Sequence, residues 1–202
     1  MSDTITLQRF TGADVERHIT DVARLRIEVF REYPYLYDGD MDYEANYLRT
    51  YTASPNSVIV IAFDGDKVVG ASTAVPLRHE MDEIKQPFVA HDLDPHSVFY
   101  LGESVLRRRY RGRGIGVRFF QEREKHARSI GEFRCCAFCA VERPANHPRR
   151  PADYVPLDEF WNKRGYVKRP DLRSTLSWRE LDEATPTPKP MVFWMKSFHS
   201  AP

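Results

Sequence analysis

The sequence predicts an α/β (α+β) fold in which one mixed sheet carries helices on both faces. The main observation is the order of the elements that the hydrophobic spacing predicts: a strand, two helices, a hairpin, a strand, a helix, a strand, a short helix and two final strands. A mixed sheet covered on both faces buries such a series economically. The 202 residues, 42% of them hydrophobic, are enough for one core, and no composition break divides them, so we expect a single domain over 1–202.

The N-terminal half predicts the first strand, two helices and the hairpin. The first strand alternates weakly, and Thr11 or Asp14 is the expected cap of the first helix. The hairpin is the clearest prediction, because two β-branched apolar segments flank the turn Asp64-Gly65-Asp66. The expected bounds are 4–10 for the strand, 13–30 for the first helix, 33–51 for a tyrosine-rich segment whose loop at 34–40 precedes the second helix, and 57–63 and 67–77 for the hairpin.

The C-terminal half predicts strands that alternate with helices. The amphipathic helix at 115–130 ends at Gly131, and the short helix at 157–164 ends at Gly165. Four prolines predict a loop at 142–156. The other expected segments are an irregular or short helical connection at 78–95, strands at 97–106, 133–141, 172–178 and 191–198, and a stiff proline-rich linker at 185–190.

Charge and hydropathy exclude several classes of protein. Thirty Lys and Arg residues against twenty-nine Asp and Glu residues give a net charge of +1, which does not indicate binding to nucleic acid or to an anionic membrane. The longest apolar run, residues 58–63, is too short to cross a bilayer. The first twenty residues contain neither the basic region nor the apolar region of a secretory signal peptide, so we expect a cytoplasmic protein.

The cysteines and histidines do not predict a metal site. Three cysteines within one segment fit reduced thiols better than a disulfide framework. On a strand, Cys135 and Cys139 share one face and Cys136 takes the other, as expected for small buried side chains. Seven scattered histidines form no H-x-x-x-H pair, so no metal is expected.

The segment that indicates chemistry is 110–116, Tyr-Arg-Gly-Arg-Gly-Ile-Gly, between a predicted strand and a predicted helix. Glycine lets a backbone approach a ligand, and the free N–H groups at a helix start suit a pyrophosphate. The spacing of Gly112, Gly114 and Gly116 is not G-x-G-x-x-G, and no Gly-Lys-Ser/Thr follows. The motif is therefore neither a dinucleotide fingerprint nor a P-loop.

This segment resembles the acyl-CoA loop of the GNAT superfamily of N-acetyltransferases, whose motif Gln/Arg-x-x-Gly-x-Gly/Ala is matched by Arg111, Gly114 and Gly116. The segment 160–166 is similar to a second family signature, and the order of elements resembles the family over nearly the whole chain. The resemblance implies a mostly antiparallel central sheet of about seven strands, splayed at a central parallel pair. It also implies acetyl-CoA as cosubstrate and direct attack by a primary amine on the thioester.

The resemblance further implies which residues form the site. Glu103, on a strand expected to be buried, is the expected general base, with an ion pair to one of the arginines as the alternative. Where family members commonly have a tyrosine as general acid, this chain has Trp161, so Tyr154 is the expected acid and Tyr166 the alternative. The residues expected to bind acetyl-CoA are Val105, Leu106, Arg111, Gly112, Arg113, Gly114, Ile115 and Gly116.

The loop between the first two helices is the expected wall of the acceptor site. Tyr33, Tyr35 and Asp38 combine aromatic rings with an acid, which suits a cationic amine of a small molecule. A protein N-acetyltransferase and a non-catalytic acyl-CoA sensor are the open alternatives. The acids at 80–83 either face the same cleft or are solvated.

Six arginines surround the glycine-rich segment and raise the alternative of an RNA-binding patch. Their place on a phosphate-binding turn favours the phosphates of CoA instead, and no nucleic-acid or membrane partner is expected. The aromatic segment 192–195 fits either a homodimer contact or a buried strand, and both remain open. The six arginines are Arg107, Arg108, Arg109, Arg111, Arg113 and Arg118.

Overall fold

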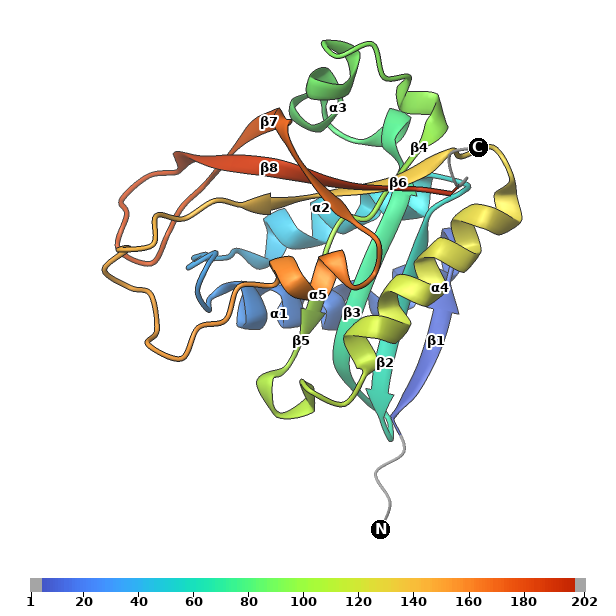
Figure 1. Cartoon of the computed structure of the whole chain (residues 1–202). Coiled ribbons are helices and arrows are strands. Elements are labelled where there is room, and N and C mark those ends of the chain that lie inside the picture. Colours follow the sequence, from blue (N-terminus) through green and yellow to red (C-terminus); the bar gives the residue numbers. More distant parts are fainter. Residues whose placement is uncertain (1–4, 199–202) are drawn as a thin grey trace.

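The computed structural model describes residues 5–198 and contains an eight-stranded sheet (Figure 1). Its strand order is β1-β2-β3-β4-β6-β8-β7, with β5 paired to β3 beyond the end of β4. The pair β4 and β6 is parallel, and the other pairs are antiparallel. This confirms the mixed, mostly antiparallel sheet that the resemblance implied.

The elements follow the predicted order. The strands are β1 (Thr6–Phe10), β2 (Val58–Asp64), β3 (Lys67–Pro76), β4 (Val98–Tyr100), β5 (Ser104–Leu106), β6 (Cys135–Val141), β7 (Val167–Trp178) and β8 (Thr187–Ser197). The α-helices are α1 (Ile19–Phe30), α2 (Met41–Ala53), α3 (Asp82–Val89), α4 (Ile115–Ile130) and α5 (Asp158–Asn162). Short 3₁₀ turns are η1 (Gly12–His18), η2 (Leu77–His79), η3 (Pro95–Ser97) and η4 (Arg108–Tyr110).

Helices cover both faces of the sheet, as predicted (Figure 1). One hydrophobic cluster joins α1, α2 and α3 to one face and includes Leu25, Leu48 and Phe88. The other joins α4 and the aromatic residues near α5 to the opposite face and includes Phe119 and Phe120. Because both faces are covered, the central strands are nearly continuous in hydrophobicity.

The β6 cysteines divide between these two clusters as expected. Cys135 and Cys139 are buried on the α1 side, and Cys136 is buried on the α4 side. Within residues 5–198, no helix combines the length and the apolar character needed to cross a membrane.

The predicted strand at 97–106 is interrupted at Leu101-Gly102-Glu103, which is why eight strands replace the expected seven or so. β4 pairs with both β3 and β6, whereas β5 pairs with β3 and not with β6. A Cβ atom at Gly102 would lie 2.3 Å from the Tyr51 hydroxyl and 2.5 Å from Thr73 Oγ1. Only glycine therefore allows the close approach of this backbone to α2 and β3.

A buried arginine of α4 holds this interruption in place. Arg123, 1% exposed, donates from Nη1 to the carbonyl oxygens of Thr73 and Glu103, at 3.1 Å each. It also donates from Nη2 to Ser104 Oγ at 2.8 Å. Each of these carbonyls also accepts a backbone bond, from the Gly102 N–H at 3.0 Å and from the Thr73 N–H at 3.1 Å respectively, so the guanidinium is a second donor to both.

The start of the first helix and its expected cap differ from the structure. Residues 13–18 form the 3₁₀ turn η1 rather than the start of α1, because periods of 3 and 3.6 residues hardly differ over so short a segment. No side chain caps this turn: Thr11 occupies the cap position without a side-chain hydrogen bond, and Asp14 pairs instead with Arg17 at 2.7 Å. Thr4, expected in the first strand, lies outside the described residues.

The proline-rich linker expected at 185–190 is also wrong for most of its length. From Thr187 onward the chain is part of β8 and pairs with β7. β6 reaches only to Val141, opposite Met191; beyond it the Glu142 N–H donates to the Pro190 carbonyl at 2.9 Å, and no strand pairs with this edge of β8 at Pro188. Proline is tolerated in a strand where the missing N–H has no ladder bond to make.

We predict that Arg123→Met lowers the free energy of unfolding by about 3 kcal/mol, because two buried carbonyls and Ser104 Oγ each lose a hydrogen bond from a charged donor. Urea denaturation measures this change. The control is Lys125→Met on the exposed side of the same helix, for which a change within about 0.5 kcal/mol is expected. Equal stabilities of the two variants would contradict the role given to Arg123.

Candidate active site

The centre of the candidate site is the place where β5 diverges from β6. The last bond between the two sides runs from the Leu101 N–H to the Ala137 carbonyl, at 2.8 Å. In the β3–β5 pair, Val105 lies opposite Ala71, and the Arg107 N–H donates to the Val69 carbonyl. Because the backbone groups of an antiparallel strand alternate in direction, those of Val105, like those of Arg107, point toward β3. By the same alternation, the Leu106 backbone faces the side from which β6 has departed. Of the two strand residues expected to bind acetyl-CoA, Leu106 therefore has its N–H directed to that side.

The glycine-rich segment forms a turn of left-handed residues before α4. Gly112 and Gly114 both have φ of +77°, and a Cβ atom on either would meet no atom within 4 Å. The first helical bond of α4 runs from the Arg118 N–H to the Gly114 carbonyl at 3.2 Å. The amides of Ile115 and Gly116 therefore have no acceptor within the helix. Successive free amides at a helix start suit an anionic group.

The arginines expected around this turn divide into structural and unpaired groups. Arg111 pairs with Glu32 of the α1–α2 connection at 2.8 and 3.1 Å and donates to the Leu106 carbonyl at 3.0 Å. Arg107 pairs with Glu28 of α1 at 2.9 Å. These two side chains fasten the turn to α1.

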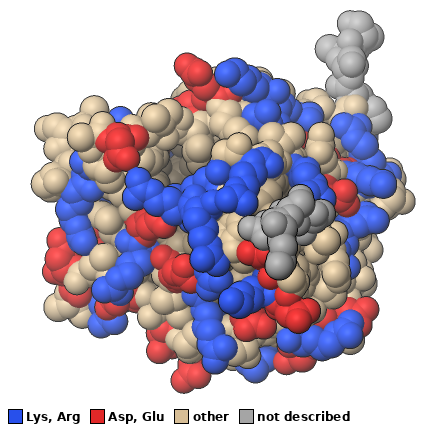
Figure 2. Space-filling view, turned by 90° about the horizontal axis from the view of Figure 1, so that it is seen from below, with Lys and Arg blue, Asp and Glu red and all other residues tan. Residues whose placement is uncertain are grey.

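Arg109 and Arg113 are different, because neither has a carboxylate partner within residues 5–198. Their guanidinium carbons lie 4.8 and 5.5 Å from the centre of the Tyr110 ring. The face seen from below in Figure 1, on which this turn lies, carries many Lys and Arg side chains (Figure 2). Unpaired cations beside free amides are suited to a phosphate-bearing ligand.

The structure brings Tyr33 and Tyr154 together, although they are far apart in the sequence. Their ring centres are 4.7 Å apart, and the His147 ring lies 5.6 Å from that of Tyr33. The Tyr33 hydroxyl is buried without a hydrogen-bond partner in the described part of the chain. The pKa of Tyr154 is raised above its usual value, mainly by burial and secondly by the neighbouring Tyr33 hydroxyl. This phenol therefore keeps its proton at neutral pH.

The other predicted acceptor residues have different surroundings. Tyr35 packs against Phe30 and Trp178, with ring centres 4.7 and 5.8 Å away. Asp38 lies between two arginines, Arg179 at 2.7 Å and Arg31 at 3.6 Å, which offset its charge.

Two aromatic residues of the late helix segment belong to the core. Tyr166 is fully buried and donates to Glu124 at 3.0 Å. Trp161 packs between Phe138 and Trp194, with ring centres 5.0 Å from each. Of the tyrosines considered for the acid, Tyr154 is thus the one beside the predicted acceptor wall.

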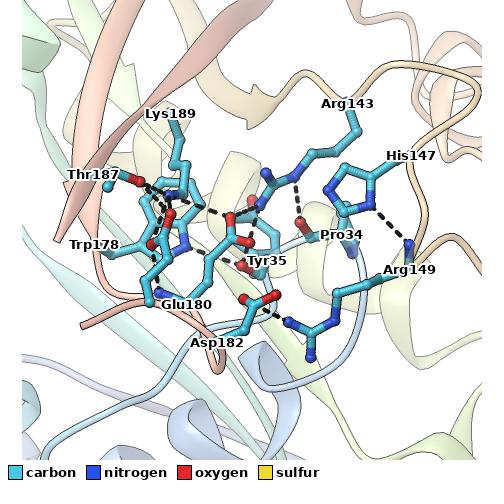
Figure 3. Close-up of polar contacts among 11 residues, drawn as sticks. Pro34, Tyr35, Arg143, His147, Arg149, Trp178, Glu180, Asp182, Thr187 and Lys189 are labelled. Atoms are coloured by element: carbon cyan, nitrogen blue, oxygen red, sulfur yellow. Dashed lines mark hydrogen bonds and ion pairs between the residues drawn. The ribbon is translucent and has the colours of Figure 1, made fainter. Parts of the chain in front are cut away.

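A buried ion cluster ties the predicted acceptor wall to the β7–β8 hairpin (Figure 3). Arg143, after β6, donates to the carbonyls of Pro34 and Tyr35 at 2.8 and 3.3 Å and pairs with Glu180 at 2.5 Å. Trp178 Nε1 donates to the same Tyr35 carbonyl at 3.0 Å. Three loops that are distant in sequence are thereby held as one wall.

Lys189 completes this cluster from β8. Its ammonium group contacts Glu183 at 2.9 Å and Glu180 at 3.4 Å, and the residue is 5% exposed. Two cations and two carboxylates therefore offset one another inside the wall, which satisfies the condition for burying charge.

Glu103 lies beneath the interruption, on the α1 side of the sheet. Its Oε1 is 2.5 Å from Arg26 Nη1, where the two atoms meet as opposite charges rather than along an N–H bond direction. Arg26 also pairs with Glu44 of α2, and its side chain is 9% exposed. The structure thus places the residue expected as base in an ion pair, the arrangement that the sequence left as its alternative.

Sequence reasoning missed Arg123 and left Glu80 among the acids at 80–83 that either face the cleft or are solvated. Glu80 follows η2, is 6% exposed, and accepts hydrogen bonds from Tyr51 Oη at 3.5 Å and from the Met81 N–H at 3.3 Å. Burial raises the pKa of Glu80 to about 7, with the Met81 N–H opposing this and the charge of Glu103 adding to it. Nothing in the local sequence distinguishes Glu80 from the exposed acids Asp82 and Glu83.

Arg123, by contrast, carried a usable signal. It lies four residues after Phe119 and four before Ala127, on the apolar stripe of α4, where an exposed arginine is not expected.

Comparisons with known proteins agree with this geometry. Residues 22–152 match the model of the acetyltransferase (GNAT) family. A search of curated proteins gives no match.

Solved structures share the fold at low sequence identity. NAA60 of Arabidopsis thaliana in complex with acetyl-CoA has 15% identity and a TM-score of 0.62, covering 98% of this chain and 100% of that chain. The ribosomal-protein-alanine N-acetyltransferase of Brucella melitensis has 13% identity and a TM-score of 0.61, covering 96% and 99%. An acetyltransferase of Thermus thermophilus has 14% identity and a TM-score of 0.55, covering 96% and 97%.

We predict that Arg143→Lys destabilises the wall, because one ammonium group cannot replace bonds to two carbonyls and a carboxylate at once. The free energy of unfolding is expected to fall by about 2 kcal/mol. Amide exchange of Asp38 and Leu181, whose N–H groups bridge the two loops, is expected to accelerate at least about tenfold. Arg149→Lys is the control, since the Arg149 ion pair with Asp182 is exposed.

We also predict that Glu80→Gln changes how stability depends on pH. The folded state holds the Glu80 proton up to about pH 7, whereas an ordinary glutamate releases it near 4.5, so the wild type loses stability as the pH rises through this interval. The neutral glutamine lacks this loss and should gain on the order of 3 kcal/mol relative to the wild type by pH 7.5. Denaturation curves at pH 4.5 and 7.5 measure the difference, with Glu83→Gln as the control. Parallel behaviour of all three proteins would show that Glu80 ionises normally.

Proposed function

Because the chain belongs to the acetyltransferase (GNAT) family, we propose that it moves an acetyl group from acetyl-CoA to the primary amine of a small molecule, by direct attack in a ternary complex. The observation that carries this proposal is the divergence of β5 from β6 next to the left-handed turn at Gly112 and Gly114. It combines an N–H directed out of the sheet with free amides at a helix start. Both features suit a thioester joined to a pyrophosphate.

The binding residues follow from this arrangement. The open space around Gly112 and Gly114 fits a phosphate close to the backbone, and Arg113 adds an unpaired positive charge. Arg111 contributes by holding the turn against Glu32. The Leu106 N–H faces the side where the thioester carbonyl would lie and would stabilise the negative charge that develops on it. When bound, acetyl-CoA supplies the activated acetyl group.

Tyr154 is the proposed general acid for the leaving sulfur. It is a neutral phenol beside Tyr33, in the loop that follows β6, and it can donate a proton without first taking one up. Glu103 as general base stays a prediction, and its ion pair with Arg26 gives it a second role, that of a fixed negative charge near the incoming amine.

The acceptor is proposed to be a small amine because the predicted wall presents the rings of Tyr33 and Tyr35, which suit a cationic amine, and because Arg143 and Trp178 fix its backbone at Pro34 and Tyr35. The similar structure named for a ribosomal-protein-alanine N-acetyltransferase makes a protein amine the second candidate. A panel of tyramine, putrescine and a peptide with a free N-terminal alanine separates the two, with free thiol as the product measured.

We predict that calorimetry at physiological salt detects acetyl-CoA and CoA binding at micromolar concentration and no binding of NAD. Arg113→Glu should weaken acetyl-CoA binding at least about tenfold, because it places a carboxylate beside the phosphates. The control Lys125→Glu lies on the exposed side of α4, the helix that follows this turn, and should bind within about twofold of the wild type. Absence of acetyl-CoA binding would overturn the proposed function, and an unaffected Arg113→Glu would overturn the placement of the phosphates.

Substitution of Gly114 is a poorer test of this turn. Its φ of +77° is one that side-chain-bearing residues rarely adopt, so a larger residue would strain the backbone as well as fill the site. Arg113 changes the charge without this strain.

A further inference from the structure

Three buried carboxylates gather around one guanidinium beneath the interruption between β4 and β5. Glu103 and Glu44 both contact Arg26. Burial by itself would lower the pKa of Arg26, but the charges of these two acids raise it well above its usual value. The third carboxylate, Glu80, has no cation within ion-pair distance in the described part of the chain. If all three carboxylates were ionised, three negative charges would face the one positive charge of Arg26 away from water, which is unfavourable.

Glu80 is the member of the cluster that can change its charge most readily. Its oxygens accept only from the Tyr51 hydroxyl and the Met81 N–H, both neutral donors. Its pKa of about 7, raised first by burial, lets it be a carboxylate or a carboxylic acid near neutral pH. Proton transfer to Glu103 would instead disrupt the contact with Arg26.

A chain of hydroxyl groups connects Glu80 to the place where the strands diverge. Tyr51 Oη lies 3.5 Å from Glu80 Oε1 and 3.0 Å from Tyr47 Oη. The same hydroxyl abuts Gly102, where a Cβ atom would be only 2.3 Å from it. Gly102 belongs to the interruption itself, one residue after the last backbone bond to β6. The Tyr51 hydroxyl, on a fully buried side chain, therefore lies between the Glu80 carboxylate and the backbone of the interruption at Gly102.

We propose that Glu80 accepts the proton of the amine substrate and that the Tyr51 hydroxyl relays it. This inference rests on the proposed function. The ammonium group gives a proton to Tyr51 Oη as Tyr51 passes its own hydrogen to Glu80, so the carboxylate becomes a carboxylic acid and Tyr51 remains neutral. The nitrogen lone pair then forms the C–N bond while the C–S bond breaks and its electron pair leaves with sulfur. Tyr154 gives its proton to the thiolate, and the second proton lost by nitrogen restores the Tyr154 hydroxyl. Glu80 then returns its proton to solvent.

The surroundings of Glu80 are consistent with this task. A general base works best when its pKa is close to the working pH, because it is then ionised and still basic. Burial keeps the Tyr51 phenol protonated by raising its pKa, as a relay group requires. The charged or titratable groups facing Glu80 are Arg26 from α1, Tyr47 and Tyr51 from α2, Tyr100 from β4, Glu103 from the interruption and Cys139 from β6.

The pH dependence of kcat/KM tests the assignment. The assay uses acetyl-CoA and whichever of tyramine, putrescine and the alanine peptide the wild type acetylates fastest. The wild type should lose activity as the pH falls through about 7. Glu80→Gln should lower kcat/KM at pH 7.5 at least about 100-fold and abolish this acid limb. Glu83→Gln, an exposed acid of the same segment, should retain both rate and profile.

Two further variants keep the test decisive. Tyr51→Phe should lower the rate like Glu80→Gln, while infrared titration still detects a carboxyl group that ionises near pH 7 in Tyr51→Phe and not in Glu80→Gln. Loss of the acid limb in Glu103→Gln but not in Glu80→Gln would overturn the inference and return the role to Glu103. A lower rate in Glu80→Gln with an unchanged pH profile would indicate a structural role only and would also overturn it.

The same experiments distinguish a failure of the proposed function from a failure of the Glu80 assignment. A wild type that binds no acetyl-CoA and acetylates none of the three amines would refute that function and this inference together. Acetyl transfer by the wild type with Glu80→Gln fully active would refute only the inference.

Discussion

The Arg123 guanidinium is the interaction on which the site depends most directly. Where β5 leaves β6, the backbone carbonyls of Thr73 and Glu103 keep one backbone donor each, the Gly102 N–H at 3.0 Å and the Thr73 N–H at 3.1 Å. Arg123 reaches from α4 and donates to both of these carbonyls and to Ser104 Oγ. One buried side chain thus stabilises an irregularity that would otherwise cost several hydrogen bonds. The same helix begins at the proposed phosphate site, so the two halves of the proposed acetyl-CoA site share one rigid element.

Glycine makes the interruption possible from the other face. At Gly102 the backbone approaches the Tyr51 hydroxyl and Thr73 Oγ1 so closely that no side chain fits. This approach brings the polar interior of the α1 and α2 side into contact with the point of divergence.

Charge has two different uses in this protein. Arg107 and Arg111 fasten the glycine-rich turn to α1 and to the connection that follows it, and Arg143 fastens the predicted acceptor wall to the β7–β8 hairpin. Arg109 and Arg113 have no carboxylate partner in the described part of the chain and are free to meet an anion. A count of arginines in the sequence therefore overstates the positive charge available to a ligand, since each ion pair removes one.

The sequence by itself determined the order of the elements, the covered sheet and the glycine-rich turn, because hydrophobic period and glycine spacing are local properties. The hairpin, α4 and its end at Gly131 needed no long-range information. Only the tertiary structure decided that Glu103 contacts Arg26 and that Glu80 is buried while Asp82 is exposed. It also decided that residues from 187 onward extend β8. Ion pairing, burial and strand pairing depend on which distant segments meet, and no spacing within one segment specifies that.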